Sequence, residues 1–254
     1  MFRYIALFLF AAALPLNAGE EIIADLSQDR VGISATFDGS HILVFGAINR
    51  DAPAPDGSPL QVVVSVSGPH EPVTIRRKDK RAGIIWVNSA SALIDDAPSF
   101  YSVATTVPLS EALTDAEDIK YKVSIPRAIS SIGTQISTGH AAEFTEALIR
   151  IRTGNGLYQV REGAVELMSE TLFRTEINLP SNLTAGVYTA RILISRDQHV
   201  VDVFETKLDI QKVGIERWLY NLAHDNALYY GLMSLFIAIA AGWTASAVFS
   251  YFKA

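Results

Sequence analysis

The densest group of charged side chains in the sequence is the run RRKDKR at positions 76–81, where five of six residues are basic. Guanidinium groups bind sulfate, phosphate or carboxylate through paired hydrogen bonds, and ammonium groups bind them as point charges. If the run lies on a strand and ends in a turn, several of these charges converge at one end of a sheet. The candidate anion-binding or docking patch consists of Arg76, Arg77, Lys78, Lys80 and Arg81.

Three interpretations of this basic patch stay open. Solvated Lys and Arg side chains commonly protect a sheet edge from pairing with another chain. The same cations could bind an anion or a lipid headgroup, or they could dock a partner protein.

The rest of the sequence carries no catalytic, cofactor or metal motif. HExxH, GxSxG, P-loop and GxGxxG patterns are absent. The acidic pairs Glu20–Glu21 and Asp95–Asp96 are expected to be solvated rather than catalytic. The histidines show no metal-ligand spacing on one helix; they are His41, His70, His140, His199 and His224. We therefore expect a protein that is not an enzyme, with no catalytic residues, no cofactor and no bound metal.

Composition narrows the class of protein. Apolar residues make up 49% of the 254-residue chain and charged residues 19%, and the apolar excess lies at the two ends. The net charge of −6 argues against binding to nucleic acid. The absence of cysteine excludes disulfides, thiolate metal sites and a lipoprotein anchor.

The first residues, MFRYIALFLFAAALPLNAGEE, have the pattern of a secretory signal peptide. Arg3 supplies the positive end, an apolar stretch follows, and Pro15 precedes a small residue at Ala18. The apolar stretch is shorter than the roughly 20 residues that span a bilayer. We expect residues 1–18 to be removed; the alternative is an uncleaved N-terminal anchor.

The last part of the sequence predicts a transmembrane helix at residues 226–252. The stretch from Ala227 to Phe252 contains no charged residue and is long enough to span a hydrocarbon core of about 30 Å. Small residues recur every fourth position and predict a helix-packing face; they are Ala238, Gly242, Ser246 and Ser250. The alternative is a simple anchor. Behind a cleaved signal peptide, this helix would leave the body in the periplasm and the C-terminus in the cytoplasm.

An amphipathic helix is predicted just before the span, at residues 213–225. Ile215, Trp218, Leu219 and Leu222 follow the i, i+3, i+4, i+7 pattern. This helix could lie in the headgroup region or dock on the exported body. The expected interfacial anchors are Trp218, Tyr229 and Tyr230.

Residues between the two ends predict a mainly β exported body with immunoglobulin-like, β-sandwich units. Alternating apolar residues indicate strands about every ten residues, as in HILVFGAI and LQVVVSVS. The predicted units are an N-terminal domain at 19–126, a helical connector at 127–156 and a smaller β-unit at 157–212. The stretch HAAEFTEALIRIRTGNG predicts the connector's main helix.

Three stretches in combination resemble the alphaproteobacterial putative transmembrane protein family (Alph_Pro_TM). They are EIIADLSQDRVGISATFDGSHILVFGAI, TIRRKDKRAGIIWVN and KVGIERWLYNLAHDNALYYGL. The resemblance covers essentially the whole chain after the signal peptide. It implies an exported body, one C-terminal span and a bacterial inner-membrane location, and it suggests an association with permeases of the anion-exporter type. The family has no established activity, so the resemblance assigns no functional residue.

Three hypotheses about function follow. The first is an accessory or scaffold protein, anchored in the inner-membrane lipid, that partners another membrane protein through its helix or body. The second is a periplasmic anion-binding or solute-binding module that uses the basic patch or a cleft between the β-units. The third is an enzyme of unknown class, which a cluster of acidic or histidine side chains in the structure would support.

Overall fold

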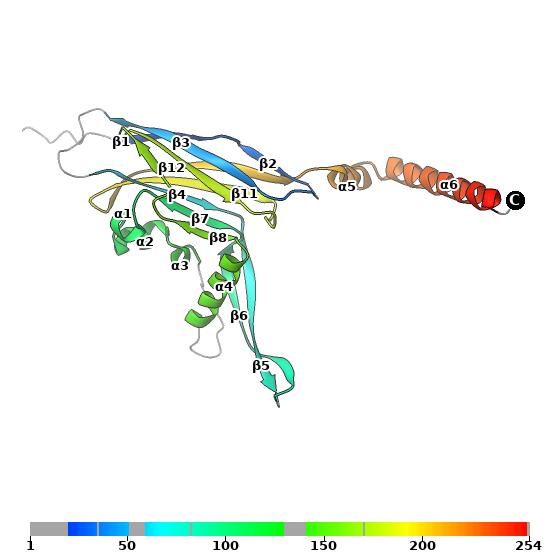
Figure 1. Cartoon of the computed structure of the whole chain (residues 1–254), viewed down its shortest axis with the longest axis horizontal. Coiled ribbons are helices and arrows are strands. Elements are labelled where there is room, and N and C mark those ends of the chain that lie inside the picture. Colours follow the sequence, from blue (N-terminus) through cyan, green and yellow to red (C-terminus); the bar gives the residue numbers. More distant parts are fainter. Residues whose placement is uncertain are drawn as a thin grey trace, which may run out of the picture.

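A computed structural model describes residues 20–34, 36–50, 59–81, 83–129, 141–169 and 171–252 of the protein. Figure 1 shows a β-rich body, a two-stranded arm that leaves the body, and two helices that extend toward the C-terminus. The prediction of a mainly β body followed by one C-terminal apolar helix is confirmed. The signal peptide predicted at residues 1–18 lies outside the described residues.

Two sheets form the body. The four-stranded sheet has the order β1-β3-β10-β9, with strands Glu20–Leu26, Ser40–Arg50, Leu172–Leu179 and Glu166–Met168. The six-stranded sheet has the order β2-β12-β11-β4-β7-β8, with strands Arg30–Ile33, His199–Lys212, Gly186–Arg196, Gln61–Ser67, Tyr101–Thr105 and Tyr158–Arg161. Neighbouring strands are antiparallel except where β2 lies beside β12 and β8 beside β7.

Strand pairing crosses the boundary that the sequence placed at residue 156. Strand β10 pairs along its length with β3, and β11 pairs with both β12 and β4. The segment 157–212 therefore shares both sheets with the segment 19–126. Local apolar alternation predicts where strands are, but it carries no information about which distant strand completes each ladder.

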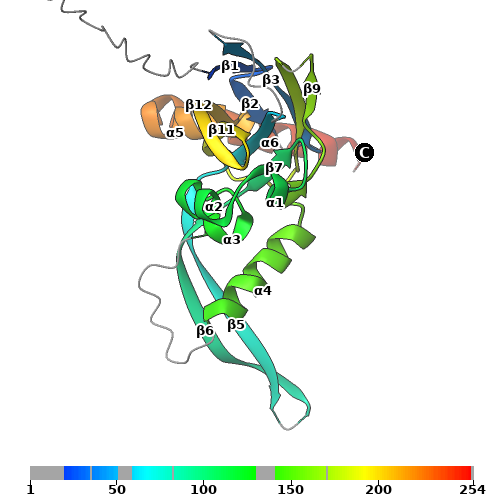
Figure 2. The same ribbon diagram turned by 90° about the vertical axis from the view of Figure 1, so that its left-hand side faces the viewer.

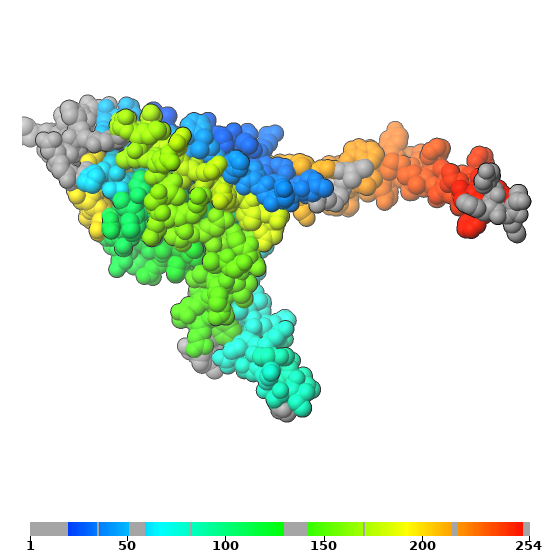
Figure 3. All heavy atoms as spheres, in the orientation of Figure 1, coloured from blue at the N-terminus to red at the C-terminus, as the bar shows by residue number. Residues whose placement is uncertain are grey.

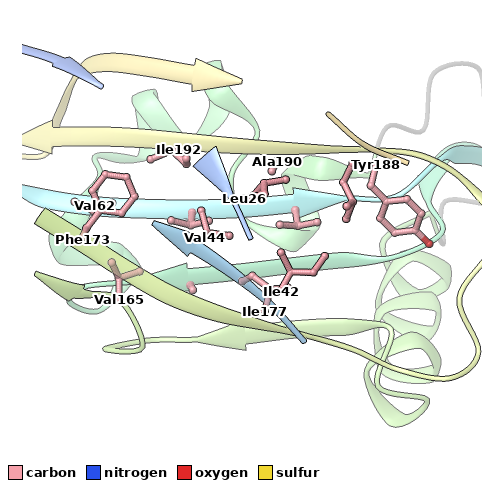
Figure 4. Packing of buried hydrophobic residues seen from close by; sticks show 14 of the residues in the cluster. Leu26, Ile42, Val44, Val62, Val165, Phe173, Ile177, Tyr188, Ala190 and Ile192 are labelled. Atoms are coloured by element: carbon pink, nitrogen blue, oxygen red, sulfur yellow. The ribbon is translucent and has the colours of Figure 1, made fainter. Parts of the chain in front are cut away.

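The main core lies between the two sheets. Val62 of β4 and Ile192 of β11 lie in this cluster with Val44 of β3 and Phe173 of β10, and all four side chains are buried (Figure 4). Val64 of β4 belongs to the same buried cluster. Alternation of side chains along each strand explains why every second residue joins this cluster. Strand β3 is central in its sheet, as its apolar sequence predicts, but Leu43 and Phe45 on its other face are exposed.

A second cluster covers the opposite face of the six-stranded sheet. Val63 and Leu193 pack there against four helices, which are α1 (Leu109–Ala112), α2 (Asp115–Tyr121), α3 (Ile125–Ala128) and α4 (Ala141–Gly154). The Thr114 side chain caps α2 by accepting a hydrogen bond from the Glu117 amide at 3.3 Å. The helical segments expected from the sequence are thus present, and they form a layer on the sheet.

The arm is a hairpin of β5 (His70–Arg81) and β6 (Ile85–Pro98), which pair only with each other. Figures 1 and 2 show that it projects away from the body, across the direction in which the C-terminal helices extend. The sequence predicts these strands but places them within the N-terminal domain. In the structure most of the hairpin lies outside the two sheets, and its inner half packs beside α4.

An ion-pair network closes one end of the body. The Oε1 atom of Glu20 lies 2.6 Å from Arg196 Nη2 and 3.0 Å from Arg50 Nε, and only 6% of the Glu20 side chain is exposed. The expectation that Glu20 is solvated is therefore wrong. A buried carboxylate is stable here because two guanidinium groups surround it.

Two helices follow the body: α5 (Ile215–Asp225) and α6 (Ala227–Phe252), separated by Asn226. Within α6, residues Ala227–Ser250 form the one described helix that is long and apolar enough to span a membrane. Its mean hydropathy is 1.9 and none of it is buried against the rest of the described chain. The predicted span at residues 226–252 agrees with α6 to within a residue.

Replacing Gly46 with Ala should destabilise the body. A Cβ atom at Gly46 would lie 2.6 Å from Phe173 Cζ and 2.7 Å from the carbonyl oxygen of Ile23, closer than a Cβ can approach. We expect Gly46→Ala to lower the free energy of unfolding by about 1–3 kcal/mol. Urea unfolding of the full-length protein in detergent measures the change.

The matched control is Gly154→Ala at the end of α4, where a Cβ meets nothing within 4 Å. It should be neutral or slightly stabilising, because Ala favours helix more than Gly does. Equal unfolding midpoints for the two variants would contradict the close contact at Gly46.

Candidate functional site

The base of the arm is fixed to the body. Ile94 and Ala97 of β6 are buried in the second cluster together with Leu148 of α4. The Tyr158 hydroxyl donates a 2.8 Å hydrogen bond to the carbonyl oxygen of Pro98, and burial raises the pKa of this phenol to about 12. The phenol therefore stays protonated at physiological pH, and the arm leaves the body from an anchored start.

The tip of the arm exposes apolar and basic side chains together. Ile84, Ile85 and Trp86 are 83%, 64% and 61% exposed. Lys80 pairs with Trp86 across the hairpin, and its Nζ atom lies 5.2 Å from the centre of the Trp ring, at cation–π distance. Figure 3 shows this end of the arm standing clear of the body. Apolar side chains this exposed are typical of an interaction surface.

All five residues of the predicted basic patch lie on β5, toward the tip, and all are exposed. Arg77 has acidic neighbours, with its Nε 3.7 Å from Asp79 and its Nη1 3.8 Å from Glu143 of α4. Ion pairs this exposed contribute little stability. The structure therefore brings the patch together with the apolar tip, which sequence reasoning missed although only two residues separate the basic run from residues 84–86.

A groove of about 370 Å³ separates the arm from α4. Its charged lining is mostly basic: Arg76, Arg77 and Lys78 from β5 and Arg150 from α4, against Glu143. Phe144 and other apolar residues form its floor. The groove is the part of the patch with the shape to receive an anion, whereas the tip is convex.

The predicted packing face of the membrane helix is uncovered. Ala238, Gly242, Ser246 and Ser250 are all exposed, and a Cβ atom at Gly242 would meet nothing within 4 Å. The Ser250 hydroxyl donates to the carbonyl oxygen of Ala247, one turn earlier in the same helix. Among the described residues nothing packs on this face.

The expected interfacial anchors lie on the outside of α5 and α6. Trp218, Tyr229 and Tyr230 are 54%, 65% and 40% exposed. On α5, Tyr220 stacks on His224 with ring centres 3.9 Å apart. Tyr220 also lines a groove between α5 and the ends of β11 and β12, so the helix stands beside the body with Trp218 exposed.

The described residues contain no group of three or more His, Asp or Glu side chains that could hold a metal ion. Of the histidines, His41 lies 3.6 Å from Glu176 and His70 lies 2.6 Å from Asp96. The second contact involves one of the acidic pairs that the sequence marked as solvated. Asp96 is instead half-exposed and hydrogen-bonded.

Comparison with known proteins gives one match. The model of the family described as "Putative transmembrane protein (Alph_Pro_TM)" matches residues 21–251. No curated protein and no solved structure matches the chain. The match includes both sheets, the arm and both C-terminal helices, as the resemblance at the sequence level implied. Because it covers most of the sequence, the chain belongs to the Alph_Pro_TM transmembrane protein family.

Proposed function

We propose that the protein is a membrane-anchored accessory protein whose arm docks on the exported surface of another integral membrane protein. The observation that carries this proposal is the arm itself, with Ile84, Ile85 and Trp86 exposed among basic side chains. A two-stranded hairpin gains little stability from its outer half. Apolar residues kept at such a position are more readily explained by a partner than by folding.

The orientation of the body follows from the two apolar ends. A signal peptide at residues 1–18 would direct the body across the membrane, and α6 would then stop transfer. The body would lie in the periplasm, with the C-terminus of α6 in the cytoplasm. Trp218 on α5 would sit at the outer headgroup level, next to the start of the span.

The direction of the arm favours a protein partner over lipid. The arm projects across the line of α6 in both Figure 1 and Figure 2. Transmembrane helices tilt by about 20° on average from the bilayer normal. With α6 in the membrane, the arm therefore runs along the membrane surface, and its tip faces a laterally adjacent molecule rather than the headgroups.

The side chains at the tip of the arm indicate what kind of partner surface they fit. Trp and Arg are the residues most enriched among those that dominate binding energy, with apolar contacts at the centre and charges around them. A fitting partner offers an apolar pocket rimmed by Asp and Glu. The small-residue face of α6 supplies a second contact within the membrane, because Gly, Ala and Ser let helix backbones approach closely.

The groove between the arm and α4 supports a second candidate function, which is anion binding. Arg76, Arg77 and Arg150 line it and could bind sulfate, phosphate or carboxylate. Isothermal titration of the full-length protein with sulfate and phosphate tests this function. Binding that is lost in Arg76→Ala with Arg150→Ala would support it, and the absence of heat would reject it.

The orientation predicts which single cysteines an impermeant maleimide can reach. The natural chain has no cysteine, so Ser89→Cys on the exposed face of the arm introduces a unique thiol. We expect this thiol to react in intact spheroplasts. A cysteine appended after Ala254 should react only after the membrane is permeabilised. The reverse pattern would contradict the proposed orientation.

Changes at the tip should weaken docking without unfolding the body. We expect Trp86→Ser to lower affinity for the partner by about 10-fold or more, because truncating a central aromatic anchor commonly costs about 2 kcal/mol. Lys80→Glu with Arg81→Glu should act similarly through charge repulsion. Quantitative crosslinking and affinity purification from native membranes measure the partner recovered.

The matched controls are Ile119→Ser and Lys120→Glu on α2, which change an exposed apolar and an exposed basic residue of the body. They should leave recovery unchanged. Equal recovery with the Trp86→Ser variant and the wild type would count against docking through the arm.

Larger side chains on the small face of α6 should disturb contacts in the membrane. We expect Gly242→Leu with Ser246→Leu to reduce copurification of the partner from native membranes, because leucine holds the helices apart. The control is Ala240→Leu with Ala247→Leu, on the opposite side of a helix with about 3.6 residues per turn. If both pairs behave like the wild type, α6 is a simple anchor.

A further inference from the structure

A serine, a histidine and an aspartate form a hydrogen-bonded chain where the arm leaves the body. Ser67 Oγ lies 3.1 Å from His70 Nε2, and His70 Nδ1 lies 2.6 Å from Asp96 Oδ1. A carboxylate only accepts hydrogen bonds, so His70 carries its proton on Nδ1. In the neutral imidazole Nε2 is then the acceptor, and the Ser67 hydroxyl can donate to it at 3.1 Å instead of to the carbonyl oxygen of Gly68, which lies 3.4 Å away. This is the arrangement in which an imidazole can remove a proton from a serine.

The fold positions each member of this chain. Ser67 ends β4, and the turn at Gly68–Pro69 brings His70 back beside it at the start of β5. The turn is tight, since a Cβ atom at Gly68 would lie 2.6 Å from Ser99 Oγ. In β6 the pairing shifts, so that Asp95 and Asp96 lie opposite the single residue Pro72. Such a bulge redirects side chains, and here Asp96 reaches His70.

Ser67, His70 and Asp96 line a pocket of about 340 Å³ on the helix-covered side of the six-stranded sheet. Arg191 and Lys122 also line this pocket. Arg191 Nη1 donates a 2.9 Å hydrogen bond to the carbonyl oxygen of Tyr121, which holds the guanidinium in place. Lys122 is the C-cap residue of α2 and has a left-handed backbone, with φ of 52°, as is common where helices end.

Two backbone amides close to the serine are already hydrogen-bonded to other parts of the described structure. The Gly68 amide donates to the carbonyl oxygen of Phe100, and the Ser99 amide donates to that of Pro69, both at 2.8 Å. Negative charge that develops beside Ser67 must therefore be met by side chains. Arg191 and Lys122 are the cations that line the pocket, and they also favour a substrate that is itself an anion.

We infer that Ser67 is the nucleophile of an acyl-transfer site that hydrolyses small esters bearing an anionic group, with His70 as general base and Asp96 as its orienting partner. The Ser67 oxygen bonds to the ester carbonyl carbon while its proton passes to His70 Nε2. The ester C–O bond then breaks, and the leaving alkoxide takes that proton. Water attacks the acyl-serine, His70 accepts its proton, and the proton returns to Ser67. The net reaction converts ester and water into carboxylic acid and alcohol.

This site is independent of partner docking, because it lies at the base of the arm rather than at its tip. No local sequence motif reveals it. Ser67 and His70 are three residues apart in a turn, and Asp96 joins them only through strand pairing. The sequence lacks the GxSxG pattern that marks many serine hydrolases.

A fluorophosphonate probe tests the inference on the full-length protein in detergent. We expect covalent labelling of Ser67, located by peptide mass spectrometry, and no labelling at this position in Ser67→Ala. His70→Ala should label about 100-fold more slowly, the lower range of a general-base contribution. The control Ser181→Ala changes an exposed serine far along the chain and should label like the wild type. Absence of labelling at Ser67, or equal rates in His70→Ala, would overturn the proposal.

Substrate class is tested with two chromogenic esters. Hydrolysis of 4-nitrophenyl succinate, which carries a carboxylate, should have a higher kcat/KM than hydrolysis of 4-nitrophenyl acetate. Both activities should fall at least 100-fold in Ser67→Ala. Equal values for the two esters would overturn the anionic substrate class, and activity retained in Ser67→Ala would overturn the nucleophile.

A thiol at position 67 distinguishes a catalytic role of Ser67, His70 and Asp96 from a purely structural one. Because the protein has no cysteine, Ser67→Cys creates a unique thiol beside His70. An imidazole at this distance promotes the reactive thiolate. Iodoacetamide should therefore modify Ser67→Cys at least 10-fold faster than Ser181→Cys, and adding His70→Ala should remove the difference. Equal rates at the two positions would show that the hydrogen bonds among Ser67, His70 and Asp96 only fix the base of the arm.

Discussion

The structure depends on a sheet that is buried on both faces. Val62, Val63 and Val64 on β4 are all fully buried, and so are Ile192, Leu193 and Ile194 on β11. Consecutive residues of a strand point to opposite faces, so both faces of this sheet must be covered. The four-stranded sheet covers one face, and the helices with the base of the arm cover the other. Each fully buried side chain of this size contributes about 1.5–3 kcal/mol.

That constraint also explains where the exposed tip of the arm and the pocket at Ser67 lie. The inner half of the arm belongs to the cover of the sheet, whereas the outer half extends beyond anything that could bury it. The pocket at Ser67 forms where the arm leaves the sheet, and Ala128 of α3 is among its lining residues. An anchored base with a pocket beside it and an exposed tip thus follow from one packing requirement.

Much of the secondary structure could be predicted from local patterns. Apolar alternation identified strands such as β3, β4 and β11, and the periodicity before the span identified α5. The basic patch lies on β5 of the hairpin. Its apolar neighbours at residues 84–86 were read as strand residues, because a strand that belongs to a sheet and one that extends into solvent have the same sequence pattern. The Glu20 network was missed because its arginine partners lie far along the chain.

The sequence by itself determined the features that depend on neighbouring residues. An uncharged run of membrane-spanning length makes α6 a helix that could span a membrane wherever the body lies, and alternation makes strands of the segments before it. Only the tertiary structure decided how distant strands interleave into two sheets, that β5 and β6 leave those sheets, and that Asp96 meets His70. These features depend on pairing register and on which faces compete for burial, and both are settled by contacts between residues far apart in the chain.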